Sequence, residues 1–242
     1  MATLPTTTAP WRPPEPVPEL RAGDRLSRAE FERRYEAMPH VKKAELIEGV
    51  VYMPSPVSEE HSQPQFDLIT WLGVYRAATP GVQGCDNGTI RLDLDNEPQP
   101  DAFLRIRPEL GGQSRTSGKY VAGPPELIAE VTASSVSYDL HDKFRAYQRN
   151  GVREYVVWRV EDRAIDWFVL REDRYAPLAA DAAGWYRSEV FPGLWLDAAA
   201  MLTGDLARVI AVVQQGVNSA EHAEFVQRLR REQEKRGGEA SR

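Results

Sequence analysis

Residues 126–131 read Glu-Leu-Ile-Ala-Glu-Val, and this short stretch decides the fold. It is largely apolar, which is typical of a strand that is covered on both faces in the middle of a sheet. A carboxylate, Glu130, nevertheless stands near its end. We therefore expect a central strand that carries an acidic side chain to one end of the sheet.

Helical and strand patterns alternate on both sides of this stretch. Ser27 and Glu30 form a capping box at the start of the first helical pattern. Helices are expected at 27–39, 58–80 and 138–150, and from 194 to the end of the chain. Strands are expected at 45–53, 89–94, 101–106, 126–131, 154–160, 164–170 and 185–191. This order predicts an α/β (α+β) domain built on a mixed β-sheet that is flanked by helices.

The chain of 242 residues divides into three parts by composition. Residues 1–24 are expected to form an extended or disordered arm, because six of the 18 prolines lie within the first 20 residues. Residues 25–200 form the expected domain, and residues 201–242 the expected C-terminal helix and charged tail. The apolar face of that helix predicts either a homodimer contact or packing onto its own domain.

Composition excludes several classes of protein. With 30 basic and 36 acidic residues the net charge is −6, so no chain-wide basic field is available to hold nucleic acid. A lone cysteine, Cys85, excludes an internal disulfide framework and a multi-cysteine zinc site. We see no secretory signal and no apolar run long enough to cross a membrane, and therefore expect a soluble cytoplasmic protein.

Two acidic residues stand at the ends of expected strands. Asp101 follows Pro100 at the start of one strand, and Glu130 lies near the end of the next. If these strands are neighbours, the two carboxylates converge, and a shared cation offsets their repulsion. Two carboxylates, a backbone carbonyl and waters make a typical magnesium site, and Lys143 on the following helix could position a water. Taken singly, Asp101 also suits a turn, Glu130 a strand edge, and Lys143 a solvated helix face.

A wider set of short motifs occurs in a definite order along the chain. Read together, these motifs resemble the Uma-two family of predicted restriction endonucleases, a branch of the PD-(D/E)XK nuclease superfamily, over residues 26–197. They are Glu45-Leu46-Ile47-Glu48-Gly49, Met53-Pro54-Ser55-Pro56, His61, Pro100-Asp101, residues 126–135, Asp139, Lys143, Tyr147 and Gly151-Val152-Arg153-Glu154-Tyr155.

The resemblance implies a restriction-endonuclease-like fold with divalent metal at the strand ends. It makes Asp101 and Glu130 the metal-binding acids. The superfamily lysine normally stands two residues after the second acid, where this chain has Thr132, and Lys143 matches a lysine moved to the next helix. Glu45 matches an early acid that binds the metal directly or through water; taken alone, it also suits a strand edge. His61 matches a family histidine that either contacts phosphate or caps the helix.

Substrate contacts are expected from basic residues near the acids in sequence. Residues 111–119 form a polar, basic segment that we expect to be a flexible loop, and its Arg115 and Lys119 are candidate DNA contacts. Alternatively, such residues only balance an acidic surface. The other histidines, His40, His141 and His222, are expected on the surface. Further basic candidates are Arg105, Arg107, Arg145, Arg149 and Arg153.

These residues together predict an endonuclease that hydrolyses DNA phosphodiester bonds with Mg²⁺ or Mn²⁺. Asp101, Glu130 and the carbonyl of Val131 would bind the metal, and Lys143 would position the attacking water. Alanine at Asp101, Glu130 or Lys143 is expected to remove cleavage and leave the fold intact. One alternative is a nuclease-fold module with weak or no catalysis that binds protein or nucleic acid, and another is a hydrolase of a different phosphate ester. Retention of all three side chains favours the enzyme.

Overall fold

The structure is a computed structural model that describes residues 16–53, 59–133 and 138–239. Most of the proline-rich arm, the first residue of the helix expected at 58–80 and the last two residues of the 126–135 motif lie outside these residues. In the described part, no helix is both long enough and apolar enough to cross a membrane.

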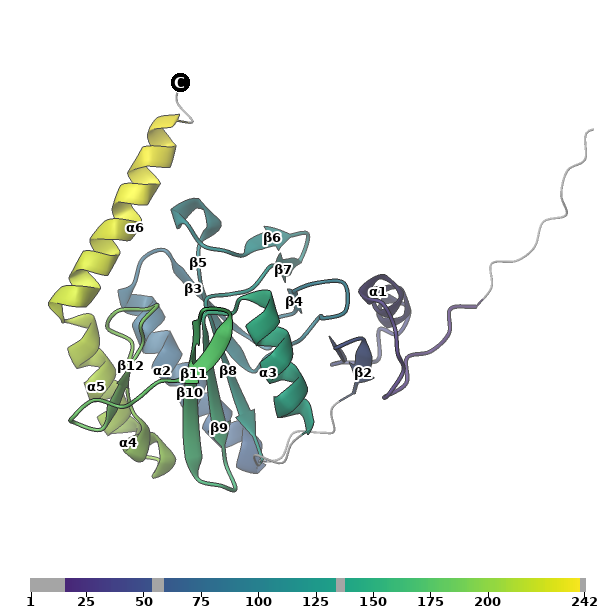
Figure 1. Ribbon diagram of the computed structural model, residues 1–242, viewed down its shortest axis with the longest axis horizontal. Helices are drawn as coiled ribbons and strands as arrows, with labels where there is room; N and C mark the ends of the chain where they lie inside the picture. The colour runs from purple at the N-terminus through teal and green to yellow at the C-terminus, as the bar shows by residue number, and fades with distance from the viewer. Residues whose placement is uncertain (1–15, 54–58, 134–137, 240–242) are drawn as a thin grey trace, which may run out of the picture.

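A mixed six-stranded sheet forms the centre of the molecule (Figure 1). Its strands are β3 (Val82–Asp86), β5 (Ala102–Ile106), β8 (Leu127–Thr132), β9 (Glu154–Arg159), β10 (Ala164–Arg171) and β11 (Arg174–Pro177). They lie in the order β11-β10-β9-β8-β5-β3, with β8 and β9 parallel and the other neighbours antiparallel. The stretch 126–131 thus supplies an interior strand, as its apolar sequence predicts, whereas β3 and β11 were not expected.

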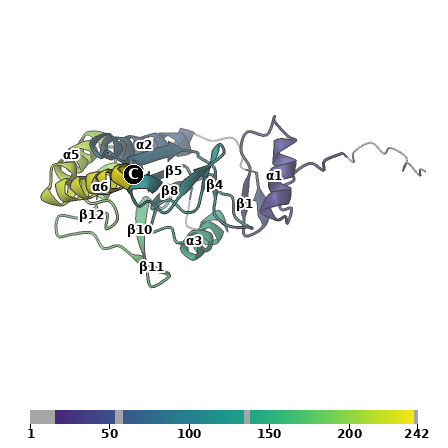
Figure 2. The ribbon, with the colours of Figure 1, turned by 90° about the horizontal axis from the view of Figure 1, so that it is seen from above.

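Helices cover both faces of this sheet (Figure 2). On one face, α2 (Glu59–Ala78) packs Trp71 and Tyr75 into the larger apolar core. On the other face, α3 (Tyr138–Asn150) packs Tyr147 into a second core cluster. This two-sided cover is the mixed sheet with flanking helices that the sequence predicts, so the fold class is confirmed.

The N-terminal unit, residues 16–53, stands beside the sheet with a small core of its own (Figures 1 and 2). It contains α1 (Arg28–Glu36), whose first turn is capped by the Ser27 side chain as predicted. The strand expected at 45–53, with its possible turn or bulge at Gly49, is a hairpin of β1 (Glu45–Ile47) and β2 (Val50–Tyr52), because Glu48 and Gly49 both take positive φ and turn the chain.

The basic segment 111–119 is not the flexible loop that its glycines suggest. Residues Arg115–Ser117 form β6, which pairs with β7 (Tyr120–Ala122), and β7 pairs in turn with β4 (Ile90–Arg91). A short 3₁₀ turn, η1 (Pro108–Leu110), joins β5 to this three-stranded sheet. The prediction was wrong because the apolar Val121 anchors the hairpin in the second core cluster, a contact that local composition does not report.

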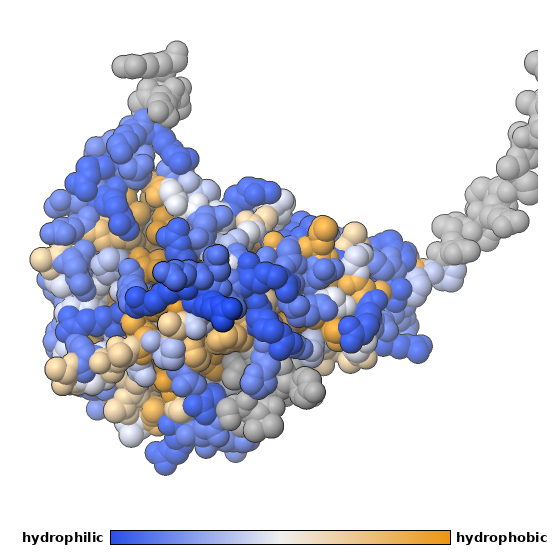
Figure 3. Space-filling view, viewed as in Figure 1, coloured by the Kyte–Doolittle hydropathy of each residue, from blue (hydrophilic) through white to orange (hydrophobic). Residues whose placement is uncertain are grey.

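The C-terminal part is not one continuous helix from residue 194. It consists of β13 (Trp195–Asp197), which pairs with β12 (Trp185–Arg187), and of the helices α4 (Ala198–Leu202), α5 (Leu206–Val217) and α6 (Ala220–Glu239). Phe225 and Leu229 of α6 are buried in the larger core, and Figure 3 shows hydrophobic side chains beside α6 on an otherwise largely hydrophilic face.

One histidine expected on the surface lies inside the molecule. His222 on α6 is 5% exposed. Its Nε2 lies 2.9 Å from the Thr79 hydroxyl, and its ring meets Tyr75 edge to face. Burial lowers the pKa of His222. It therefore joins α6 to the end of α2 as a neutral packing residue.

Candidate functional site

The register between β5 and β8 brings the two predicted acids together. Ala102 pairs with Ala129, so the next position places Asp101 opposite Glu130. The backbone N of Asp101 lies 3.4 Å from Glu130 Oε2, and Asp101 Oδ2 accepts a 2.8 Å hydrogen bond from the Val131 N–H. Both side chains are buried, at 5% and 6% exposure. Two carboxylates therefore share one small volume at the end of the central strand.

Lys143 enters this volume from the second turn of α3. Its Nζ lies 3.0 Å from Glu130 Oε1 and 3.1 Å from Glu45 Oε1. Burial lowers the pKa of Lys143, but the carboxylates of Glu130 and Glu45 outweigh burial, so the pKa is raised. The ammonium thus stays charged. It can donate hydrogen bonds and offset negative charge, but it does not act as a base near neutral pH.

Glu45 comes to the site from the N-terminal unit. The backbone N–H of Gln99 donates a 2.7 Å hydrogen bond to Glu45 Oε1. The neighbouring Leu46 exchanges two backbone hydrogen bonds with Glu97, of 3.2 and 2.7 Å. Burial, together with Glu32, raises the pKa of Glu97 to about 8. The two backbone hydrogen bonds to Glu97 therefore fix the strand that holds Glu45.

Tyr147 is a functional candidate to which the sequence assigned no role. It lies four residues after Lys143, one helical turn further on the same face of α3. Its fully buried hydroxyl donates a 2.8 Å hydrogen bond to Glu130 Oε1, the oxygen that Lys143 also contacts. Burial and the Glu130 charge raise the pKa of Tyr147, so the hydroxyl keeps its proton. Two donors thus hold one oxygen of Glu130 and turn the other toward Asp101.

His61, on the first turns of α2, lies beside Asp101 and Val131. Its Nε2 is 2.9 Å from the Val131 carbonyl oxygen, which accepts its N–H, and 3.5 Å from Asp101 Oδ2. His61 thus contacts two of the groups that were expected to bind metal. With 29% of its side chain exposed, His61 stands at the mouth of the acidic cluster.

Lys43 is a second cation that the sequence did not single out. Its Nζ lies 3.9 Å from Asp101 Oδ1 and donates a 3.1 Å hydrogen bond to Asn87 Oδ1. Its side chain is 27% exposed. Lys43 therefore stands at the solvent side of the cluster, whereas Lys143 is buried within it.

Arg115 and Lys119 lie away from the acids. They belong to the β6–β7 hairpin, and Thr116 of this hairpin accepts a 3.0 Å hydrogen bond from Arg105. Arg105 is four residues along β5 from Asp101, which corresponds to roughly 13 Å of strand. On α3, Arg145 and Arg149 pair with Asp142 and Glu48. These candidate DNA contacts therefore lie outside the cluster.

The charges of the cluster suit a divalent cation. Glu45, Asp101 and Glu130 are buried around one buried ammonium, so the carboxylates outnumber the buried cations. In the residues that the structure describes, no three His, Cys, Asp or Glu side chains are arranged as a ready metal cage. Mg²⁺ is commonly held by one or two carboxylates and several waters, and it prefers such oxygen donors. The donor set of Asp101, Glu130 and the Val131 carbonyl therefore fits this ion.

Replacing Tyr147 by phenylalanine is expected to lower the free energy of unfolding by about 1.5–3 kcal/mol, the usual range for a hydrogen bond to a charged group. Urea unfolding of the metal-free protein measures this. Tyr175→Phe is the matched control, because the Tyr175 hydroxyl donates to a neutral acceptor, the Val152 carbonyl, at 2.9 Å. Equal losses in the two variants would contradict a charged Glu130.

Comparisons with known proteins agree with this fold. The crystal structure of a protein from Anabaena variabilis ATCC 29413, described as a "putative nuclease belonging to DUF820", is similar to this chain with a TM-score of 0.52 and 9% sequence identity. The match covers 75% of this chain and 97% of that one, and it shows a shared fold. The comparison with curated proteins finds no match. The family model described as "Putative restriction endonuclease" matches residues 28–199, so the chain belongs to the Uma2 (Uma-two) family.

Proposed function

We propose that the protein is an endonuclease that hydrolyses DNA phosphodiester bonds with Mg²⁺ or Mn²⁺. The observation that carries this proposal is the excess of buried carboxylate around the charged Lys143 at the end of β8. Asp101, Glu130 and the Val131 carbonyl would hold the ion. When bound, the ion would polarise the phosphoryl group and lower the pKa of the attacking water.

The protein's own groups have distinct parts in this proposal. The Lys143 ammonium, fixed by Glu45 and Glu130, donates a hydrogen bond to the attacking water and stabilises charge that develops on the phosphate. Tyr147 and Glu45 act as positioning residues, because they touch Glu130 and Lys143 rather than the substrate. His61 and Lys43, at the mouth of the cluster, would contact the phosphates next to the cleaved one.

A specific observation favours the alternative of a binding module with little catalysis. The arginines of α3 are occupied by acidic partners, and the net charge is −6. Because phosphate contacts supply most of the non-specific affinity for DNA, this protein would bind duplex DNA weakly unless metal offsets its charge. Arg115 and Lys119 would then contact DNA only beyond the cleavage site, along β5.

The proposal is tested by incubating the purified protein with supercoiled plasmid and millimolar Mg²⁺ or Mn²⁺. We expect nicked plasmid, and no nicking in the presence of a chelator. Short single-stranded DNA and RNA are tested in the same way. Protein that binds the metal by calorimetry and cuts none of these substrates would support the binding module instead.

Asp101→Asn is expected to leave the metal-free protein as stable as the parent, or more stable by up to about 1 kcal/mol, although most substitutions destabilise. The amide removes one of three crowded charges and can still accept the hydrogen bond from the Val131 N–H. The parent should gain about 2.7 kcal/mol at a hundredfold excess of Mg²⁺ over its Kd, and the variant should gain none.

Thermal melts of both proteins, with chelator and with Mg²⁺, measure this difference. A variant that melts well below the parent in chelator would make Asp101 a structural hydrogen-bonding residue. Equal gains of both proteins from Mg²⁺ would place the ion elsewhere.

A further inference from the structure

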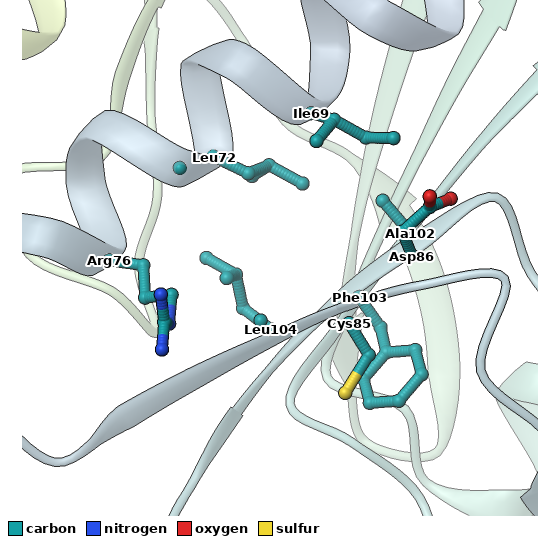
Figure 4. Close-up of a pocket in the computed structure, with 10 residues that line it drawn as sticks. Ile69, Leu72, Arg76, Cys85, Asp86, Ala102, Phe103 and Leu104 are labelled. Carbon is teal, nitrogen blue, oxygen red and sulfur yellow. The ribbon is translucent and has the colours of Figure 1, made fainter.

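A pocket lies between α2 and the edge of the sheet (Figure 4). Its volume is about 200 Å³, roughly the volume of seven water molecules in liquid water. In Figure 4, Ile69, Leu72 and Leu104 point into the space between the helix and the strands. Arg76 stands at one end, and Asp86 stands with Ala102 at the other. The pocket therefore has apolar walls and a charged group at each end.

This pocket begins one residue from the acidic cluster, on the α2 face of the sheet. Ala102, which lines it, follows Asp101 in the chain and pairs with Asp86 across the β3–β5 ladder. The N–H of Asn87 donates to the Asp101 carbonyl at 3.2 Å, and Gln65 on α2 donates to Asp86 Oδ1 at 3.2 Å. The side chains of Asp101 and Ala102 face opposite sides of the sheet, but His61 at the start of α2 lies 3.5 Å from Asp101 Oδ2. A nucleotide with its phosphate at Asp101 and His61 can therefore turn its base toward α2 around the edge strand β3.

The outer face of α2 carries an aromatic ring in line with the pocket. Phe66 is 68% exposed, and it belongs to the same helical stripe as Ile69, Gly73 and Arg76, at spacings of three, four and three residues. His61, one turn before Gln65, contacts the metal-site carbonyl of Val131. Helix α2 therefore carries His61 at the cluster, the exposed ring of Phe66, and then the residues that line the pocket.

We propose that the pocket and Phe66 bind an unpaired nucleobase of the nucleotide next to the cleaved phosphate, so that the substrate is single-stranded or locally opened DNA. This inference rests on the proposed nuclease function. A base has flat apolar faces, which suit Phe66 and the leucine walls, and hydrogen-bonding edges, which suit Asp86 and Arg76. A paired base inside a duplex offers neither face to the protein.

A peptide strand added to the outer edge of β3 is the competing occupant, because β3 is the last strand of the sheet. The pocket, however, opens beside the helix stripe and reaches inward to Leu72 and Leu104, behind the edge itself. An added strand would cover the edge and leave this inner space empty. The geometry therefore favours a ring that enters the pocket.

Gly73 offers a sharp test, because it lines the pocket. A Cβ at Gly73 would meet nothing within 4 Å outside its own helical turns, and its φ is helical. Leucine and alanine both raise helix propensity relative to glycine, so neither variant should lose stability. Gly73→Leu fills the pocket, whereas Gly73→Ala leaves most of it open and serves as the matched control.

Binding is measured by fluorescence anisotropy with a labelled 12-nucleotide single strand and with the same sequence as a duplex, in millimolar Ca²⁺, with a gel to show that the probe stays uncut. We expect Gly73→Leu and Phe66→Ala each to raise the Kd for the single strand about tenfold, the effect of one lost base stack. Gly73→Ala should leave it unchanged. So should Leu94→Ala, which removes an equally exposed apolar side chain, 73% exposed, away from the pocket.

The outcomes separate this inference from the proposed function. Plasmid nicking with unchanged single-strand Kd in both variants would overturn the base pocket and keep the nuclease. Equal losses of affinity for the single strand and the duplex would also overturn it, because the pocket and Phe66 would then contact the DNA backbone rather than a base. Selective loss of single-strand binding in a protein that cuts nothing would support the pocket while the nuclease proposal fails.

Discussion

Replacing Lys143 by methionine is expected to lower the free energy of unfolding of the metal-free protein by about 3–5 kcal/mol, the usual cost of removing one partner from a buried ion pair. Methionine keeps the length of the side chain, but it leaves Glu45 and Glu130 without their shared cation. Urea unfolding followed by circular dichroism measures this loss. The burial of Lys143 thus changes the sequence-based expectation that its removal leaves the fold intact.

The matched control for this variant is Arg145→Met, two residues further along α3. Arg145 forms its ion pair with Asp142 at the surface, where its side chain is 62% exposed, so the loss should stay within about 1 kcal/mol. Adding Glu45→Gln and Glu130→Gln to Lys143→Met should recover much of the stability, because the unpaired charges disappear. A single Lys143→Met variant as stable as the parent would show that the two carboxylates are not both ionised.

Changing Glu130 to glutamine is expected to reduce the metal-dependent nicking rate by more than about 100-fold. Replacing a residue that only supports a metal ligand usually lowers metal affinity or activity about 10–100-fold. We expect a larger loss here, because we propose that Glu130 binds the ion itself. The amide can still accept a hydrogen bond from Tyr147, so the fold should survive. Initial nicking rates over a Mg²⁺ titration, together with calorimetric Mg²⁺ binding, measure the effect.

Two other variants make this result specific. Glu109→Gln changes the net charge by the same amount at an exposed position on η1, and it should not alter the rate. Glu45→Gln should reduce the rate less than Glu130→Gln and leave Mg²⁺ affinity nearly unchanged, because Glu45 touches Lys143. If the Glu130→Gln enzyme kept the parental nicking rate and the parental Mg²⁺ affinity, Glu130 would not be a metal ligand.

Local sequence was sufficient to predict where Asp101 and Glu130 stand. Each acid adjoins a short apolar strand, and two such strands in succession commonly pair, which fixes the acids at one end of the sheet. The helix with Lys143 was also predictable, since apolar spacing and Gly151, at φ 81°, mark its end. The convergence of these elements follows from the order of helices and strands along the chain.

The rest of the site depends on contacts between distant residues. Glu45 meets Lys143 across almost a hundred residues, and nothing in the sequence near either one indicates that the lysine is buried. The role of Tyr147 is hidden for a different reason, because a tyrosine on the apolar face of a helix is usually only part of the core. Its spacing of four from Lys143 was the feature that could have revealed it.

Misassigned elements share the same cause. The glycines and serines of residues 111–119 are typical of loops, yet pairing with β4 turns this segment into a hairpin. On α6, charged residues surround Phe225 and Leu229 in the sequence, so the pattern predicts a solvated tail. Both side chains are nevertheless buried. Tertiary packing decides these segments, and short-range patterns carry little information about it.

The small core of the N-terminal unit has a consequence for how the protein can be shortened. The family match begins at residue 28, but Leu20, which is 3% exposed, belongs to that core, and Gly23 and Leu26 donate backbone hydrogen bonds to Val51 and Gly49. A recombinant chain cut at the family boundary would lose these contacts and loosen the hairpin that presents Glu45. The shortest expressible unit that keeps the site therefore starts ahead of the region by which the family is recognised.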